Sequence, residues 1–518
     1  MFVQMGVFLP IDSFTRKHRN RKLMILLRKT GQFLFLALLT CLVTTTQANV
    51  QHEAAALIRT ANLGGADVGL YAIDLQTGEV LVKLNPNDPL IPASNMKLLT
   101  TASALNELGP EFLFKTKLKL TPPDPVIGKP SLILQGDGDP SLGDPVLLEA
   151  HGLDVDQLIQ QWVAVVQKTG ITEFDQLIID DRIFDRNFVH PAWPEDQLNR
   201  WYCAQVAGIN FHDNCLDIYP RPTRSGLAPF LRISPESPFL RLSNRAVSGS
   251  TDSFWIYRRM ETNEMTFRGV VKYPRSSPEN VTLHDPPNYL AMLLQHNLAQ
   301  AGIKVNHLYR PPMDEILPQS RDLHIVQTTI DVVLNRCNKD SQNLFAEALF
   351  KRAGREMTGV PGSWETGRAA MRIFLRSRLG SAAASVEIDD GSGMSRNNKV
   401  SPKAIVDLLV SMYRDPRLGS TYLRSLSVGG KDGSLRKRFK DLDVTVLGKT
   451  GYIRSVSTLS GFAVLPRPDH PEGPRVFAFS FMFNNFKAPV YVYQVKALQD
   501  KLVELLDKEA SYLVESGK

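Results

Sequence analysis

The sequence predicts an α/β fold in which the two ends of the chain build one domain and the middle is inserted into it. Residues 66–84 alternate apolar and polar positions around the turn "QTGE", which predicts two paired strands. Residues 328–425 carry apolar residues at helical spacing, and alternation returns over 444–465 and 475–486 before a terminal amphipathic helix. In between, residues 115–135 are predicted to be strands and 155–168 a helix, and residues 175–320 alternate short apolar runs with Pro- and Gly-rich turns, so 115–320 is interpreted as a mostly β insertion.

The composition is that of a soluble globular protein. The chain has 518 residues, more than one ordinary domain, with 43% hydrophobic and 22% charged residues. The formal charge of +7 belongs mostly to residues 1–48, which hold seven basic residues and one acid, so the remainder carries +1. The run "RKRFK" at 436–440 is interpreted as a solvated face. We therefore expect no nucleic-acid partner.

The first 48 residues predict a signal peptide. The apolar run Phe33–Val43 is eleven residues long, whereas a helix that spans a bilayer needs ~20. It follows a basic pair and precedes the small-residue stretch "TQA", which is the order of a secretory leader. The sequence thus predicts a periplasmic or otherwise extracytoplasmic protein, with an uncleaved anchor as the alternative. Whether translation starts at Met1 or Met24 stays open.

Cysteine and histidine patterns predict no metal and no cofactor. After the leader three cysteines remain, Cys203, Cys215 and Cys337. An exported protein meets oxidising conditions, so Cys203 and Cys215 are candidates for a disulfide, which the sequence leaves open. Cys337 lies in an apolar helical stretch and is interpreted as a small buried side chain. Neither C-x-x-C nor H-E-x-x-H occurs.

The tripeptide Lys-Thr-Gly occurs three times, in three different settings. The copy at Lys29 lies in the leader. The copy at Lys168 ends a predicted helix, where a cation suits the helix dipole and the glycine suits a left-handed cap. The copy at Lys449 follows an alternating strand, and Gly451 would let a ligand approach the backbone. Only this third copy is a candidate for binding an anionic substrate.

Ser94 and Lys97 form an S-x-x-K motif at the head of a helix that Gly109 ends. Positions i and i+3 share one helix face, so the amine can reach the hydroxyl. A buried lysine near other cations loses its proton readily and can take the proton of the serine. A second copy at Ser434 and Lys437 follows three glycines and is interpreted as a turn with a basic surface.

Ser341 and Asn343 form an S-x-N motif between two helical stretches. A hydroxyl there can relay a proton to a leaving group, and an amide can fix both a lysine and a substrate. The same letters at Ser395–Asn397 are interpreted as a chance copy. Each motif alone is weak evidence, whereas the order S-x-x-K, S-x-N, K-T-G is typical of serine β-lactamases and penicillin-binding proteins.

With these motifs the chain resembles the class C low-molecular-mass penicillin-binding proteins, the D-alanyl-D-alanine carboxypeptidase/endopeptidases. The 247-residue separation of Ser94 from Ser341 and the segments "GDGDPSL", "DDGSGMSR" and "SVSTLSGF" carry the resemblance, which covers nearly everything after the leader. It implies a penicillin-binding transpeptidase-like (serine β-lactamase-like) α/β domain with two nested, mostly β inserted domains. The expected division is a signal peptide over 1–48, the transpeptidase-like domain over 49–114 and 321–518, a first inserted domain over 115–137 and 218–320, and a nested inserted domain over 138–217.

The resemblance also implies roles for the catalytic residues. Ser94 would be the acylated nucleophile and Lys97 its base. Ser341 would shuttle protons and Asn343 would hold the peptide. Backbone N–H groups of Ser94 and Tyr452 would form the oxyanion hole, which contributes roughly 3–4 kcal/mol per donor in other hydrolases.

The remaining implied roles concern the substrate peptide. Lys449 and Thr450 would bind its terminal carboxylate, with Gly451 beside them, and Arg396 resembles a family residue that lines the pocket. Two positions depart from the family pattern. Tyr452 stands where the family usually has Thr or Ser, which removes a short hydroxyl from the carboxylate site. Gln197 aligns where the family often has an acid that holds the free amine of the peptide side chain.

The sequence therefore predicts a serine-type D-Ala-D-Ala carboxypeptidase/endopeptidase that acts on peptidoglycan stem peptides and is acylated by β-lactam antibiotics. A serine β-lactamase is one alternative, although no group that would activate the deacylating water is evident. A catalytically degenerate wall-binding protein of the same fold is the other, with Tyr452 as its main support. Tyr202 has two interpretations, an aromatic contact to the peptide or a packed core residue. Peripheral contact with a membrane stays open.

Overall fold

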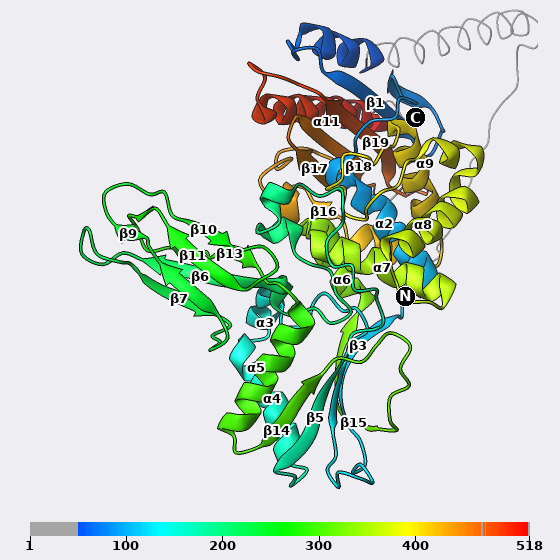
Figure 1. The fold of residues 1–518 in the computed structure, drawn as a ribbon. Coiled ribbons are helices and arrows are strands. Elements are labelled where there is room, and N and C mark those ends of the chain that lie inside the picture. Colours follow the sequence, from blue (N-terminus) through cyan, green and yellow to red (C-terminus); the bar gives the residue numbers. More distant parts are fainter. Residues whose placement is uncertain (1–49, 468–469, 472, 516–518) are drawn as a thin grey trace, which may run out of the picture.

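A six-stranded antiparallel sheet forms the centre of the larger domain (Figure 1). The computed structural model describes residues 50–467, 470–471 and 473–515. Strands from both ends of the described chain lie side by side, because β1 pairs with β19 over its whole length. Both ends of the described chain therefore contribute strands to one sheet. The order is β16 (Ser427–Val428), β17 (Thr445–Ile453), β18 (Val456–Leu465), β19 (Arg475–Asn484), β1 (Asp67–Asp74) and β2 (Val80–Leu84).

Helices cover both faces of this sheet. The four phenylalanines of β19 at 477, 479, 481 and 483 belong to one core with α11 (Val492–Glu515) and the helix over residues 50–60. Val476, Ala478 and Met482 point to the other core, because neighbouring side chains in a strand face opposite sides. The helices on that side are α2 (Met96–Leu108), α6 (Ile330–Lys339), α7 (Asn343–Thr358), α8 (Trp364–Leu379), α9 (Pro402–Tyr413) and α10 (Gly419–Arg424).

A second unit is inserted between α2 and α6. Its core is a five-stranded sheet with α4 and α5 packed on it through residues such as Trp162 and Leu294. The sheet contains β14 (Lys304–Tyr309), β5 (Glu173–Asp180), β4 (Leu132–Gln135), β3 (Leu113–Leu120) and β15 (Arg321–Thr329), in that order. The helices of this unit are α3 (Pro145–Ala150), α4 (Val155–Gln167) and α5 (Pro286–Gln300).

A third unit, over residues 215–282, is all β and nested in the second (Figure 1). It contains three small sheets, in the orders β13-β6-β7, β10-β11-β8 and β12-β9. Its strands are β6 (Cys215–Arg221), β7 (Phe230–Ser234), β8 (Arg241–Asn244), β9 (Val247–Ser248), β10 (Trp255–Arg258), β11 (Glu264–Arg268), β12 (Val270–Val271) and β13 (Glu279–Thr282).

The sheets place the internal boundaries differently from the predicted division. The predicted nested domain over 138–217 contains β5, which pairs in parallel with β4 and with β14 and so belongs to the larger inserted sheet. The nested β unit begins at Cys215 instead. The return to the first domain also comes later than 321, since β15 pairs with β3. Parallel strands are joined by long crossovers, so local alternation does not show which strands pair. With α4 and α5 packed on its sheet, the larger insert combines helices and strands, and only the nested unit is all β.

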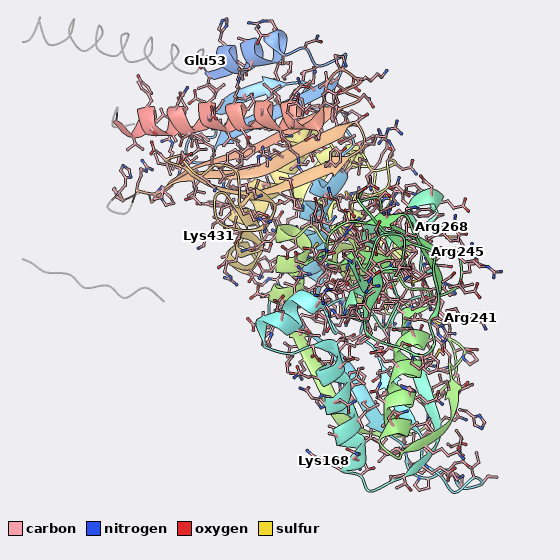
Figure 2. The ribbon with its side chains drawn as sticks, turned by 90° about the vertical axis from the view of Figure 1, so that its left-hand side faces the viewer. Glu53, Lys168, Arg241, Arg245, Arg268 and Lys431 are labelled. Carbon is pink, nitrogen blue, oxygen red and sulfur yellow. The ribbon has the colours of Figure 1, made fainter. Side chains whose placement is uncertain are left out.

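The structure also bears on the predictions made for the leader, the cysteines and Lys168. The predicted signal peptide lies outside the described residues. Cys203, Cys215 and Cys337 are buried and unpaired, so the disulfide left open between the first two is absent. Lys168 caps the end of α4, and Figure 2 shows it at the far end of the insert from the six-stranded sheet. Among the described residues, no helix is both long and apolar enough to cross a membrane.

Candidate active site

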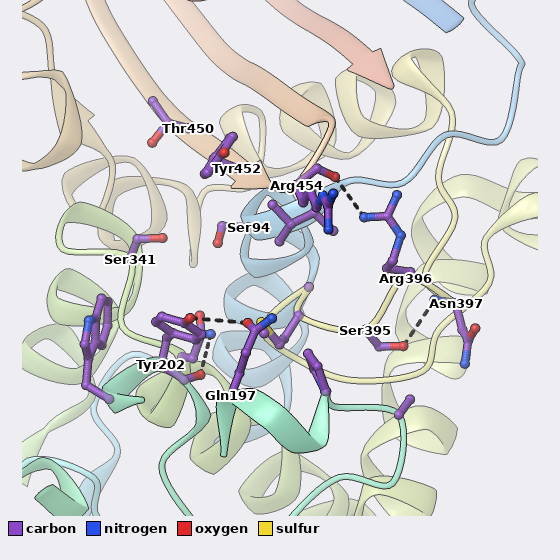
Figure 3. Close-up of a pocket in the computed structure, with 17 residues that line it drawn as sticks. Ser94, Gln197, Tyr202, Ser341, Ser395, Arg396, Asn397, Thr450, Tyr452 and Arg454 are labelled. Carbon is purple, nitrogen blue, oxygen red and sulfur yellow. Dashed lines mark hydrogen bonds between the residues drawn. The ribbon is translucent and has the colours of Figure 1, made fainter. Parts of the chain in front are cut away.

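The three motifs meet in one groove of about 770 Å³ between the six-stranded sheet and the helices below it (Figure 3). Ser94, Ser341 and Thr450, one from each motif, line it. We call the part built by Ser94, Lys97, Ser341, Asn343 and Lys449 the inner end. We call the part built by Gln197, Tyr202, Arg396, Tyr452 and Arg454 the outer end.

Ser94 lies on a short 3-10 turn, η1 (Ala93–Asn95), that leads directly into α2. Lys97 is therefore in the first turn of α2, one turn beyond the serine, as predicted. The backbone around the serine is tightly packed. Ala93 has φ +46°, and a Cβ on Gly393 would lie 1.8 Å from the Ala93 carbonyl oxygen. Only a glycine at 393 allows this approach.

The Lys97 amine has no solvent exposure and three oxygen neighbours. Its Nζ lies 3.1 Å from Ser94 Oγ, 2.6 Å from Asn343 Oδ1 and 2.8 Å from the Ser392 carbonyl oxygen. The last two can only accept, so they fix two N–H bonds of the neutral amine, and its lone pair must point at the Ser94 hydroxyl. Burial lowers the pKa of Lys97 to about 8. The arrangement suits a general base for Ser94.

Both polar atoms of the Asn343 side-chain amide make hydrogen bonds within the protein. Its Oδ1 accepts from Lys97, and its Nδ2 donates to the Tyr202 carbonyl at 2.8 Å. The amide thus ties the base to the segment between β5 and β6. Each of these two atoms makes one hydrogen bond and keeps a second hydrogen-bonding position, and Asn343 lines the groove, so the expected contact with the peptide stays a prediction.

Ser341 and Lys449 form the second serine–lysine pair. Ser341 sits at the turn between α6 and α7 with φ +59°, a conformation that non-glycine residues adopt rarely. Lys449 Nζ donates to Ser341 Oγ at 2.8 Å and to the Thr450 carbonyl at 2.8 Å. Burial, and then the nearby Lys97, lower the pKa of Lys449 well below its usual range. The serine hydroxyl keeps its proton for donation into the groove.

Gly451 lets β17 lie against the turn that carries Ser94. A Cβ at this position would be 2.2 Å from Thr458 Oγ1, 2.8 Å from the Pro92 carbonyl oxygen and 3.0 Å from the Ser94 nitrogen. The strand backbone and the Ser94 N–H are therefore adjacent, which is the arrangement that an oxyanion hole needs. Tyr452, the next residue, has 54% of its side chain exposed.

At the outer end Arg396, Tyr452 and Arg454 are exposed, Gln197 and Tyr202 are half-buried, and none of the five is an acid. Gln197 Oε1 accepts from the Tyr202 hydroxyl at 3.2 Å, and Arg396 donates to the Arg454 carbonyl at 2.9 Å (Figure 3). None of the described residues that line the groove is an aspartate or a glutamate. Glu195 and Asp196, which flank Gln197 in sequence, line a different hollow.

Several residues at the site were not singled out from the sequence. Glu347 and Asp390 are fully buried carboxylates around the turn that holds Ser392. Glu347 follows Asn343 by four residues on α7, and this i, i+4 spacing is a signal that the sequence does carry. Asp390 Oδ2 accepts from the indole of Trp193 at 3.0 Å. Ser434, interpreted as part of a turn and a basic surface, accepts from the Thr450 hydroxyl at 2.8 Å.

The described residues contain no cluster of three or more His, Cys, Asp or Glu side chains that could hold a metal ion. The polar groups of the inner end are instead paired with one another, as two serine–lysine pairs. Such a set can activate a hydroxyl, stabilise an oxyanion and attract a carboxylate.

The model of the D-Ala-D-Ala carboxypeptidase 3 (S13) family matches residues 50–508. The chain belongs to this family. The predicted family is thereby confirmed, and with it a serine peptidase of the D-Ala-D-Ala carboxypeptidase type.

Individual relatives agree with this assignment. A D-alanyl-D-alanine carboxypeptidase of Actinomadura sp. (strain R39) is 29% identical over 488 residues, 89% of this chain and 86% of that one. The D-alanyl-D-alanine carboxypeptidase DacB of Haemophilus influenzae is 23% identical over 417 residues, 77% of this chain and 82% of that one. The crystal structure of penicillin binding protein 4 from the same organism superposes with a TM-score of 0.71 at 20% identity, over 88% of this chain and 99% of that chain. The predicted fold is confirmed by this likeness.

Proposed function

We propose that this S13-family peptidase cleaves the D-Ala–D-Ala bond of peptidoglycan stem peptides through an acyl-serine at Ser94, and that β-lactams acylate the same residue. The observation that carries the proposal is the Lys97 amine, whose lone pair is directed at Ser94 by two carbonyl acceptors. Ser94 Oγ attacks the scissile carbonyl carbon while its proton passes to Lys97. The oxyanion forms against the N–H groups of Ser94 and Tyr452.

The leaving D-alanine then departs with a proton. The C–N bond breaks as the Ser341 hydroxyl, held by Lys449, relays a proton to the leaving nitrogen. Water subsequently attacks the ester at Ser94, which releases the shortened peptide and restores the serine. Lys449 and Thr450 attract the terminal carboxylate of the substrate from β17. Arg396 and Arg454 add positive charge at the outer end.

Export belongs to the same proposal. The peptidoglycan substrate lies outside the cytoplasm, and the leader pattern over residues 1–48 fits secretion to that compartment. The crystal structure of the Haemophilus influenzae protein with a bound β-lactam supports acylation by such drugs, because that protein shares the fold over 88% of this chain.

The experiment is the intact mass of residues 49–518 after brief exposure to benzylpenicillin, beside Ser94→Ala. We expect a lasting adduct on the unmutated protein and none on the variant. A transient adduct with consumption of the drug would favour a β-lactamase instead. A folded protein without any adduct would favour a degenerate wall-binding protein and overturn the proposed function. Parallel assays with a D-Ala-D-Ala peptide and a cross-linked dimer would then measure the balance of carboxypeptidase and endopeptidase activity.

A further inference from the structure

Glu347 is a buried carboxylate of α7 that the mechanism above does not use. It has no solvent exposure. Its oxygens accept three hydrogen bonds, from the backbone N–H of Gly391 at 3.0 Å, from that of Ser392 at 2.7 Å and from the indole of Trp364 at 2.9 Å. An ionised carboxylate can accept all three, whereas a protonated one would turn an acceptor into a donor. The three surrounding donors therefore favour the ionised form of the Glu347 carboxylate.

Glu347 is hydrogen-bonded to Ser392, and Ser392 is in turn hydrogen-bonded to Lys97, the proposed general base. The carbonyl of Ser392 accepts from Lys97 at 2.8 Å, while the N–H of the same residue donates to Glu347. The next N–H, that of Gly393, belongs to the same peptide group as the Ser392 carbonyl and donates to Asp390 Oδ1 at 2.8 Å. The Ser392 carbonyl is thus fixed through both of its neighbouring N–H groups.

The direction of this carbonyl decides where the Lys97 lone pair points. If the Ser392 oxygen turned away, only Asn343 would fix the amine, which could then rotate its lone pair away from Ser94. In many nucleophile–base pairs a third residue orients the base by a direct contact. Glu347 would do the same for Lys97 indirectly, through the backbone of Ser392.

We propose that Glu347 is a positioning residue for Lys97. It holds the Gly391–Ser392 backbone so that the Ser392 carbonyl fixes the amine, and its charge stabilises the ammonium that forms when Lys97 takes the Ser94 proton. This inference rests on the proposed function, because it assigns a role within the same acylation step.

The electrostatic surroundings are consistent with this role. Burial, reinforced by Asp390, raises the pKa of Glu347 to about 7, while its hydrogen bonds oppose the rise. The charges of Glu347 and Asp390 raise the pKa of Lys97, against the larger effect of burial. The titratable groups that face Lys97 are Cys337 on α6, Glu347 on α7, Asp390 in the turn and Lys449 on β17. Those that face Glu347 are Asp390, Lys97, Cys337 and, on its own helix, Lys351.

Two substitutions separate charge from geometry. Glu347→Gln keeps the size but loses the charge, and its NH₂ group would face a donor. We expect the second-order rate constant for acylation by benzylpenicillin to fall about 10- to 100-fold. The acid-side midpoint of its pH profile should move to lower pH, because Lys97 loses a neighbouring negative charge. Glu347→Asp keeps the charge but shortens the reach, so the rate constant should fall while the midpoint stays.

The measurement is the acylation rate constant of full-length mature protein from pH 5.5 to 9.5, with the melting temperature of each variant as a check on folding. An unmoved midpoint in a folded Gln variant, or an unchanged rate constant in either variant, would overturn the inference. If the Gln variant does not fold, the rate constant of the Asp variant decides. A lack of acylation in the unmutated protein would instead overturn the proposed function itself, and the inference with it.

Discussion

The inner and outer ends of the groove are built in opposite ways. At the inner end Lys97 and Lys449 are shielded from solvent and bonded to serine, amide and backbone oxygens. At the outer end Arg396 and Tyr452 are exposed, and the side chain of Gln197 accepts a hydrogen bond of 3.2 Å from the Tyr202 hydroxyl. Under the proposed function, buried and mutually hydrogen-bonded groups would carry out the reaction, whereas exposed side chains, which can change without disturbing those groups, would select among peptides.

The strongest test of the inner end is removal of the base. Lys97→Met should lower the rate constant for acylation by about 10²–10⁴, because general-base catalysis is lost. Quenched-flow mass spectrometry with benzylpenicillin measures this directly. Lys437→Met, which removes the exposed lysine of the second S-x-x-K copy, is the matched control and should leave the rate unchanged. Equal losses in both would contradict the assignment of the motif.

The pH dependence of the unmutated protein tests the same end without a mutation. Burial depresses the pKa of Lys97 to about 8, and the proposed general base is the free amine. Acylation should therefore rise with pH through about 8 and fall about tenfold per unit below it, or about 100-fold at pH 6. A flat profile from pH 6 to 9 would mean that Lys97 does not act as the base.

A third test concerns the close approach of β17 to the nucleophile. Gly451→Ala would place a methyl group against Thr458, Pro92 and the Ser94 nitrogen, and should lower acylation about 10- to 100-fold by moving the strand. Gly448→Ala, on the same strand, meets its nearest atom, the Ser460 carbonyl oxygen, at 3.1 Å, which is tight without overlap, so it is the milder comparison. The two rate constants are compared after the melting temperatures show both variants folded. Similar rates would argue against an oxyanion hole between this strand and Ser94.

At the outer end, one added negative charge should change the preference among peptide substrates more than the maximal rate of cleavage. Gln197→Glu adds the acid that the groove lacks. We expect kcat/KM for peptides with a free side-chain ammonium to rise about three- to tenfold relative to peptides whose amine is acylated. Gln197→Met, of similar length without charge, should show no such preference. An equal change for both peptide types would place Gln197 outside the contact.

The smallest expected effect is at the carboxylate site. Tyr452→Thr restores a short hydroxyl beside Thr450 and should lower KM for peptides with a free terminal carboxylate about three- to fivefold, with kcat nearly unchanged. Steady-state release of D-alanine measures both constants. A peptide with an amidated terminus serves as the control, since it offers no carboxylate. An equal gain for the amidated peptide would show that Tyr452 acts through steric hindrance alone.

The sequence predicted which residues come together at the inner end better than it predicted which strands of the insert pair with one another. S-x-x-K is a local pattern on one helix, so its geometry follows from helical spacing, and the K-T-G strand alternates visibly. The contact between the Ser392 carbonyl and Lys97 was not predictable in this way, because every residue has a backbone carbonyl and the residue type does not show which one accepts a hydrogen bond. Parallel pairing of β4 with β5 was equally hidden, and this is why the nested unit was placed at 138–217 rather than 215–282.

Two contacts of the segment between β5 and β6 bear on how this chain could be shortened. The indole of Trp193 donates to Asp390, and the carbonyl of Tyr202 accepts from Asn343. Excision of residues 113–329 would therefore leave Asp390 and Asn343 without these partners, and Asn343 is the residue whose amide oxygen accepts from Lys97. Although the insert interrupts the sequence of the larger domain at one place, a protein trimmed to that domain would lack two of the hydrogen bonds that hold the surroundings of Lys97.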